Sequence, residues 1–379
     1  MDTATDFLEE KVRNGLGRVF AAGVLMAGVG LALNAGATGQ NEAPALTEVF
    51  TDANFQLTGV TISKSGRLFV NYPRWSDHYV NAVVEIQKDR TVKPYPDEPW
   101  NRWSGKAADA GKQFVCVQSV VVDDNEVLWV VDSGAPLMGP AMVAGAKLVS
   151  IALKGNQVSH IYTFGPDVIK PNSYLNDVRI DNPRHIAYMT DSGEGGIVVV
   201  DLASGKAHRA LDGHASVMAQ EGTTLTIDGK KLLNGDGKPP KINSDGIALS
   251  PDREYLYYQA LTGKTLYRVK TAALRDAKGT KAAAAVEKVA DTFPVDGLWM
   301  DKQGNVYLSG LEQKAVVRMT PDKKIESVVT DARLEWPDTF TQAADGTMYI
   351  TASHINESPR FNGGTEVRKL PYGVFKFKP

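Results

Sequence analysis

The sequence is poor in reactive groups, and this scarcity limits the chemistry it can perform. Cys116 is the single cysteine, so no intrachain disulfide can form. Its apolar surroundings, FVCVQSVVV, favour a buried small hydrophobe over a reactive thiol. There is no Gly-x-Ser-x-Gly, phosphate-binding loop, dinucleotide fingerprint or His-rich metal motif. Nucleophilic catalysis and an organic cofactor therefore have no support.

An excess of charge of one sign is also lacking. The chain carries 42 Lys and Arg against 44 Asp and Glu, a formal net charge of −2, and has no basic run. This balance argues against a nucleic-acid partner. A hydrophobic content of 43% is ordinary for a soluble globular protein.

No apolar run reaches the length of about 20 residues that a membrane span requires. The longest, Phe20–Leu33, follows three basic residues and precedes Ala35-Gly36-Ala37, a small-x-small pattern typical of signal cleavage. We predict a signal peptide over residues 1–37 and a linker over 38–45, with a secreted or periplasmic protein and no stable membrane partner after cleavage. Acidic residues near the N-terminus leave an uncleaved anchor as the alternative.

One pattern repeats six times along the rest of the chain. Each copy has a small polar residue, a short apolar run, an Asp- or Gly-containing turn and an aromatic-rich strand. The copies begin at Thr58, Gln118, Asn176, Asp245, Asp296 and Asp338. Strand pairs repeated every 40–60 residues or so are typical of a β-propeller. We therefore predict an all-β, six-bladed β-propeller as a single domain over residues 46–379. The alternating segments 46–50 and 373–377 are expected to share the last blade, which leaves no open edge.

Two stretches interrupt the repeat. Residues 82–112 contain clustered Pro and Trp and are interpreted as an ordered loop. Residues 211–243 form the longest insertion and include a predicted hairpin, TLTIDGKKL. Long insertions in a propeller usually lie on one face, so we expect them to cover the mouth of the channel.

The first residues of the repeats are the strongest candidates for a site. If the repeats superpose, these residues form a ring at one end of the central channel, where three carboxylates would repel one another unless a cation or proton intervenes. Oxygen ligands suit Ca²⁺ or another divalent cation. We predict Asn176, Asp245 and Asp296 as its ligands. The alternative is that Asx-Gly only serves turns before strands.

Other polar and aromatic residues complete the candidate site. His214, in the long insertion, and His354, after the last repeat, are candidate acid–base groups near the mouth. The predicted ligand-binding residues are Asn176, Asp245, Asp296, Asp338 and His354, and the predicted catalytic residues are Asp245, Asp296 and His214. Aromatic candidates for a pocket, which could instead pack between blades, are Trp75, Tyr174, Trp336 and Phe361.

Two Asp-Ser-Gly triplets, residues 132–134 and 191–193, superficially suggest an aspartic protease. They lie one repeat step apart, and both end the second strand of a repeat. We interpret them as products of duplication.

The repeats resemble the yellow / major royal jelly protein family, including its bacterial members. The resemblance covers nearly everything from Leu46 onward. The segments that carry it include LTGVTISKSGRLFVNYPRW, CVQSVVVDDNEVLWVVDSG, SDGIALSPDREYLYYQALTGKTLYRV and WPDTFTQAADGTMYITASHINE. The resemblance implies a secreted six-bladed propeller. Insect members include dopachrome-converting enzymes, and some salivary members bind biogenic amines in the central channel.

A more distant similarity links the chain to the gluconolactonase / senescence-marker superfamily of metal-dependent lactone hydrolases. It implies metal ligands at Asn176, Asp245 and Asp296. Those hydrolases also use a Glu from the first blade, whereas this chain has Gln56, Leu57 and Thr58 there.

The sequence thus supports an exported propeller that binds a small polar or aromatic molecule and isomerises it by acid–base chemistry. A metal-dependent lactone hydrolase and a non-catalytic binding protein remain the alternatives. The sequence does not determine the ligand or the oligomeric state.

Overall fold

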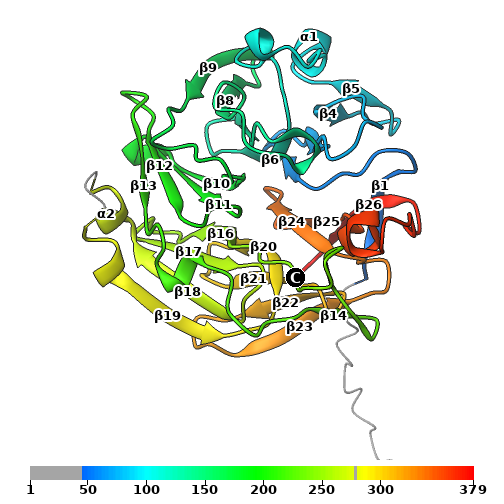
Figure 1. Ribbon diagram of the computed structural model, residues 1–379, viewed down its shortest axis with the longest axis vertical. Coiled ribbons are helices and arrows are strands. Elements are labelled where there is room, and N and C mark those ends of the chain that lie inside the picture. The colour runs from blue at the N-terminus through cyan, green and yellow to red at the C-terminus, as the bar shows by residue number, and fades with distance from the viewer. Residues whose placement is uncertain (1–44, 277–279) are drawn as a thin grey trace, which may run out of the picture. The chain divides into compact units, whose positions relative to one another are not determined.

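The computed structural model describes residues 45–276 and 280–379. Within this part of the chain, six four-stranded antiparallel sheets surround a central axis, which confirms the predicted six-bladed propeller (Figure 1). The predicted signal or anchor, residues 1–37, lies outside the described residues, as does the linker up to residue 44. No helix among the described residues is long and apolar enough to cross a membrane.

Each blade is a meander whose first strand lies nearest the axis. In the first three blades, the strands follow in sequence order from the inside outward. Blade 1 contains β2 (Val60–Ile62), β3 (Leu68–Asn71), β4 (Val83–Ile86) and β5 (Val92–Pro94). Blade 2 contains β6 (Val117–Val122), β7 (Val127–Asp132), β8 (Lys147–Ala152) and β9 (Gln157–Thr163). Blade 3 contains β10 (Leu175–Asp181), β11 (Ile186–Asp191), β12 (Ile197–Asp201) and β13 (Ala207–Ala210).

The remaining blades follow the same order, and the last one closes the ring. Blade 4 contains β16 (Ser244–Leu249), β17 (Tyr255–Ala260), β18 (Thr265–Lys270) and β19 (Val286–Asp291). Blade 5 contains β20 (Val295–Met300), β21 (Val306–Gly310), β22 (Ala315–Met319) and β23 (Ile325–Thr330). Blade 6 contains β24 (Pro337–Gln342), β25 (Met348–Ala352), β26 (Tyr372–Phe377) and, outermost, β1 (Thr47–Asp52). The expected pairing of the two ends of the propeller is confirmed, because β1 pairs with β26.

The insertions agree with the predictions only in part. Residues 82–112 are not merely a loop, because β4 and β5, the two outer strands of blade 1, lie there beside the short helix α1 (Glu98–Asn101). The Pro residues misled the prediction, since Pro94 occupies the end of an edge strand, where a missing N–H is tolerated. The predicted hairpin in the second insertion is present as β14 (Thr226–Ile227) and β15 (Lys230–Lys231). A second short helix, α2 (Thr271–Leu274), follows β18.

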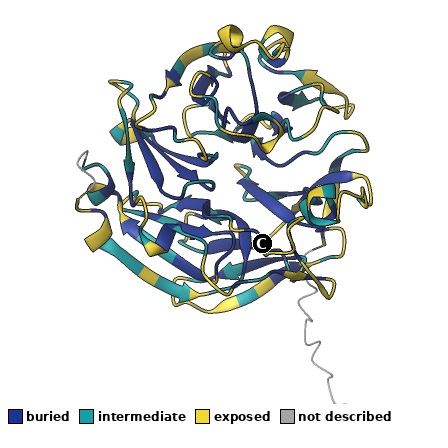
Figure 2. Cartoon of the chain, viewed as in Figure 1, coloured by how far each residue is buried: buried dark blue, intermediate teal, exposed yellow. Residues whose placement is uncertain are grey.

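The apolar core lies between the blades. Six clusters of buried residues each combine side chains from two neighbouring sheets, one cluster for every interface around the ring. The inner strands are buried along most of their length, whereas exposed residues concentrate on the outermost strands and loops (Figure 2). Burial on both faces explains the apolar runs of the middle strands, such as VVV in Ile197–Asp201.

The inner strands of blades 3 to 6 each contain a β-bulge at the start of the repeat. The strand register shifts between residues 175 and 178, 244 and 247, 295 and 298, and 337 and 340. The unpaired residues include Asn176, Asp245, Asp296 and Asp338. These residues are therefore inside bulged strands, so the alternative that Asx-Gly here only makes turns is wrong. A bulge leaves its extra residue out of the ladder and redirects side chains.

In blades 3, 5 and 6, a hydroxyl group on the second strand satisfies the backbone of the bulge. Ser309 Oγ accepts hydrogen bonds from the amides of Asp296 and Gly297, at 3.0 and 2.9 Å. Thr190 Oγ1 accepts from the amide of Asp177 at 3.1 Å and donates to the Asp245 carbonyl of the next blade at 2.6 Å. The bulges are thereby fixed in place and linked from blade to blade.

Candidate functional site

One large cavity opens at the end of the channel where the inner strands begin. Its volume is about 980 Å³. Loops from every blade form its wall. The second insertion contributes Lys241 and Ile242, as expected, whereas the first insertion, residues 82–112, contributes no lining residue, contrary to the expectation. The aromatic side chains that line it are Phe55, Tyr72, Trp75, Tyr79, Tyr174, Trp336, Phe361 and Tyr372. An aromatic wall of this kind suits a flat, largely apolar ligand.

The base of this cavity holds three of the predicted site residues. Asn176, Asp245 and Asp296 all line the cavity and come from β10, β16 and β20. The indole Nε1 of Trp336 donates a hydrogen bond of 2.6 Å to Asp296 Oδ2. The carboxyl groups of Asp245 and Asp296 also interact, and each shifts the pKa of the other.

Burial and mutual repulsion set the ionisation of this pair. Burial raises the pKa of Asp296 to about 6, although the hydrogen bonds from Trp336 and Asp245 oppose the rise. Burial also raises the pKa of Asp245 well above its usual range, and the charge of Asp296 raises it further. The pair therefore combines a carboxyl group with a pKa of about 6 and a second carboxyl group whose pKa is raised well above its usual range. General acid–base chemistry uses carboxyl groups shifted in this way.

Further charged residues lie deeper along the inner strands. Asp338 does not line the cavity; it is buried, and its Oδ2 has no hydrogen-bond partner. Burial, followed by the charges of Asp296 and Asp177, raises its pKa well above the usual range. Arg179 crosses from blade 3 to blade 5, where it donates to the Leu298 carbonyl at 2.7 Å. Its side chain therefore spans the channel beneath the acids and places a positive charge there.

Trp336 is held in an unusual backbone conformation. Its φ is +55°, in the left-handed region that bulky residues rarely adopt, and its side chain is fully buried. Hydrogen bonds from the amide and hydroxyl of Ser353 to the Trp336 carbonyl, 3.1 and 3.2 Å long, fix this conformation. Strain of this kind persists where the surroundings over-determine it, often at binding sites. The left-handed backbone of Trp336 directs its indole N–H toward Asp296.

The two predicted histidines lie outside the cavity lining. His214 caps the short helix 215–217 by accepting from the Ser216 amide, and it does not contribute to the cavity. His354 is buried behind the wall, with Nδ1 2.9 Å from Glu357 Oε2 and its ring edge-to-face with Tyr372. The structure thus brings together Asn176, Asp245 and Asp296 but neither histidine. The roles of all these residues in binding and catalysis remain predictions.

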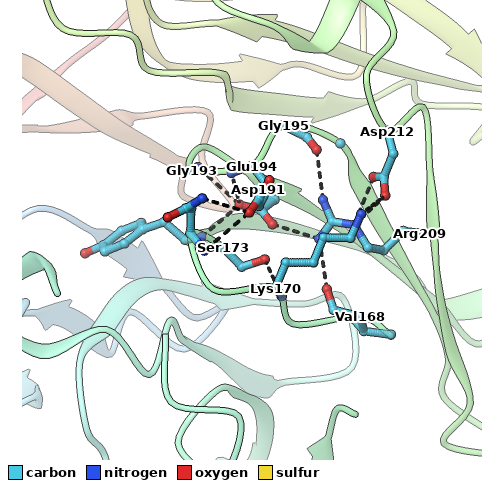
Figure 3. Close-up of polar contacts among 12 residues, drawn as sticks. Val168, Lys170, Ser173, Asp191, Gly193, Glu194, Gly195, Arg209 and Asp212 are labelled. Atoms are coloured by element: carbon cyan, nitrogen blue, oxygen red, sulfur yellow. Dashed lines mark hydrogen bonds and ion pairs between the residues drawn. The ribbon is translucent and has the colours of Figure 1, made fainter. Parts of the chain in front are cut away.

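The Asp residues of the two Asp-Ser-Gly triplets hold the backbone in place beside the site. Asp191 accepts hydrogen bonds from the amides of Tyr174, Gly193 and Glu194 and pairs with Arg209 at 2.8 Å (Figure 3). Asp132 has the same role one blade earlier, where it accepts from the amides of Val115, Cys116 and Gly134. Both fix the chain at or just before an inner strand, which explains their spacing of one repeat.

The donor set, two carboxyl groups and one carboxamide, matches a hard cation in chemistry. Among the described residues, no three His, Cys, Asp or Glu side chains are grouped to hold a metal ion. Asp296 Oδ2 already accepts a hydrogen bond from Trp336. A divalent cation at Asn176, Asp245 and Asp296 therefore stays a prediction, and no reaction step is derived through it.

Sequence reasoning missed several residues of the site. Asp177 and Arg179 follow the repeat start by one and three positions, and the bulge that redirects Asp177 cannot be read from the sequence. The aromatic residues at repeat boundaries were the useful signal: all four that the sequence singled out, Trp75, Tyr174, Trp336 and Phe361, line the cavity.

The raised pKa of Asp296 predicts that stability falls as pH rises. The native state holds a proton that the unfolded state releases near pKa 3.8, so the stabilisation is complete below that pH and is lost as pH rises through about 6. The difference between the folded and unfolded pKa values of Asp296 corresponds to roughly 3 kcal/mol in the free energy of unfolding. Urea unfolding at about pH 5 and about pH 8 should show a smaller slope with pH for Asp296→Asn than for wild type or the exposed Glu221→Gln control. An unchanged slope in Asp296→Asn would contradict the assignment.

The fold is that of a six-bladed β-propeller, and solved structures of other proteins superpose on it. A gluconolactonase from Xanthomonas campestris superposes with a TM-score of 0.54 at 12% identity, covering 88% of this chain and 89% of that one. A luciferin-regenerating enzyme superposes with a TM-score of 0.53 at 11% identity, covering 89% and 95%. At such identities the likeness shows the fold alone.

The family follows from the sequence. The major royal jelly protein family matches residues 115–360, and the chain belongs to it. Major royal jelly protein 1 of Apis mellifera is 28% identical over 193 residues, which cover 48% of this chain and 42% of that protein. The chain thus spans less than half the length of the curated relatives it matches.

Proposed function

We propose that this protein binds a small aromatic molecule in the channel cavity, with the polar end of the molecule on Asp245 and Asp296. The observation that carries the proposal is a pair of interacting carboxyl groups with raised pKa values at the base of an aromatic cavity of about 980 Å³. Such a cavity has the size and lining of a small-molecule site, and its few polar groups converge at one end.

We further propose that the pair catalyses an isomerisation. A tautomerisation removes a proton from one atom of the substrate and returns one to another, so it needs a base and an acid but no cofactor. Asp296, with a pKa of about 6, takes up the proton, while Trp336 holds its Oδ2 in place. Asp245, whose pKa is raised by burial, carries the other proton and donates it. The reaction leaves the pair with its proton moved from one carboxyl group to the other, and proton exchange between the two groups resets it.

Export to the periplasm or the cell exterior completes the proposal. It is supported by the apolar run and cleavage pattern of residues 20–37. N-terminal sequencing of the exported protein should find a chain that begins near Thr38.

Replacing Asp296 tests the proposal. Asp296→Asn removes the base with little change in volume, and it should lower turnover of a converted ligand by about 10²- to 10⁴-fold. Asp301→Asn is the matched control, since Asp301 belongs to the same blade and is about as buried but does not line the cavity. Ligands are first found by thermal-shift screening of aromatic compounds, and conversion is then followed by absorbance. Equal losses in the two variants would contradict the assignment, and binding without conversion would identify a non-catalytic binding protein.

A metal-dependent lactone hydrolase is the second candidate. The shared gluconolactonase-like fold and the joint position of Asn176, Asp245 and Asp296 favour it. Gln56, which lines the cavity from the first blade without a carboxylate, argues against it. A cation that binds only the native state would raise the unfolding midpoint. A rise with Ca²⁺ that disappears in Asp296→Asn would support this candidate, and a rise that persists would place the cation elsewhere.

A further inference from the structure

The rim of the cavity carries more positive than negative charge. Within the described ranges, the lysines and arginines that line the cavity are Lys241, Arg360 and Arg368, and outside its base the only lining carboxylate is that of Glu366. Arg368 pairs with Glu366. Among the described residues, neither Lys241 nor Arg360 forms an ion pair with a carboxylate, so their charges are free to meet a ligand.

The two unpaired cations belong to one side of the cavity. Lys241 precedes Ile242, and Arg360 precedes Phe361. Ile242 and Phe361 both pack against the apolar cluster that contains Trp336. Both cations therefore lie next to residues that pack against Trp336, the residue whose indole donates to Asp296.

Arg360 is held over the cavity by groups that leave its charge uncompensated. Its guanidinium lies 5.3 Å from the ring centre of Phe361, and Nη1 is 3.1 Å from Met138 Sδ. Neither neighbour is an anion. Although the residue as a whole is exposed, desolvation lowers the pKa of the guanidinium, with the nearby Tyr174 opposing the shift. A guanidinium at the edge of a cavity without a counter-ion attracts an anionic ligand group.

We propose that the cavity selects aromatic molecules that carry a carboxylate, and that Arg360 binds this carboxylate, with Lys241 as a second contact. This inference rests on the proposed function, because it concerns the ligand of the same cavity. The flat guanidinium fork matches a carboxylate with two parallel hydrogen bonds. A ligand with an ammonium group would be repelled at the rim, and a neutral one would gain no charge-assisted bond.

Three compounds with the same ring and different charge test the proposal. Indole-3-acetate, indole-3-acetamide and tryptamine carry negative, zero and positive charge at neutral pH. Isothermal titration calorimetry should show that indole-3-acetate binds about tenfold more tightly than indole-3-acetamide, with tryptamine the weakest ligand. Arg360→Gln should remove the advantage of the acetate and leave the affinity for the acetamide unchanged. The control is Arg90→Gln, the same substitution at an exposed position far along the chain from any cavity residue.

The outcomes separate this inference from the proposed function. If tryptamine or the acetamide binds as tightly as the acetate, or if Arg360→Gln weakens all three equally, the carboxylate preference is wrong. If all three bind equally and Asp296→Asn weakens them, the cavity still binds aromatic molecules but does not select by charge. If none binds, both the inference and the proposed aromatic site fail. An unchanged unfolding midpoint in Arg360→Gln excludes misfolding as the cause of any loss.

Discussion

Gly297→Ala is expected to destabilise the propeller by at least about 3 kcal/mol. A Cβ at this position would lie 2.0 Å from the carbonyl oxygen of Asp338 and 2.9 Å from its carbonyl carbon. Both atoms are backbone of the next inner strand, so no side chain can move aside. The methyl group would therefore force blades 5 and 6 apart at the channel.

Gly235→Ala is the matched control, because no heavy atom lies within 4 Å of a Cβ at this position and its backbone is not left-handed. Urea unfolding of both variants gives the comparison, and Gly235→Ala should stay within about 0.5 kcal/mol of wild type. The damage in Gly297→Ala should extend to ligand binding, since Asp296 precedes the altered residue. A loss below about 1 kcal/mol would show that the bulge is more compliant than its contacts imply.

Lys147→Met is expected to cost about 3–5 kcal/mol, since it leaves a buried carboxylate without its partner. Lys147 and Asp132 have fully buried side chains, with Nζ 2.6 Å from Oδ2. Nζ also donates to the carbonyl groups of Ala110 and Gly145, both at 2.9 Å. All three ammonium protons are therefore used, and methionine replaces none of these bonds.

Two further variants show how much of the lost stability comes from the buried ion pair. Lys154→Met alters an exposed lysine of the same blade and should change the free energy of unfolding by no more than about 0.5 kcal/mol. Asp132→Asn combined with Lys147→Met should recover part of the loss, because no buried charge remains. If the single variant Lys147→Met is as stable as wild type, the buried pair contributes nothing net to folding.

The repeats made the fold predictable, because a six-fold pattern of strand pairs leaves few ways to bury its apolar faces. The position of the carboxyl groups followed from the same pattern, since superposed repeats place equivalent residues around one axis. The chemistry of the site did not follow. Nothing in the spacing indicates that Trp336 adopts a left-handed backbone and donates to Asp296, or that Arg179 reaches from blade 3 to blade 5.

The histidines show the limit of sequence reasoning in another way. His214 was attractive because it lies in the long insertion, yet only the tail of that insertion, at Lys241 and Ile242, reaches the cavity. The conformation of an insertion depends on its own contacts, and His214 is used to cap a short helix. The role of charged rim residues such as Arg360 could not be predicted from the sequence either, because an unpaired charge can be recognised only when its neighbours are known.

The closure of blade 6 also decides how the molecule can be tethered. Ala53 and Tyr372 both line the cavity; β1 ends just before the first of them, and β26 begins at the second. Each strand has six residues, about 20 Å of chain, so Thr47 and Phe377 lie on the opposite side of the disc. Attachment directly at either of these two residues, to a resin, a fusion partner or a bilayer, would place the support on the side opposite the cavity. Its opening would then face the bulk solution, and ligands would arrive from there rather than from the support.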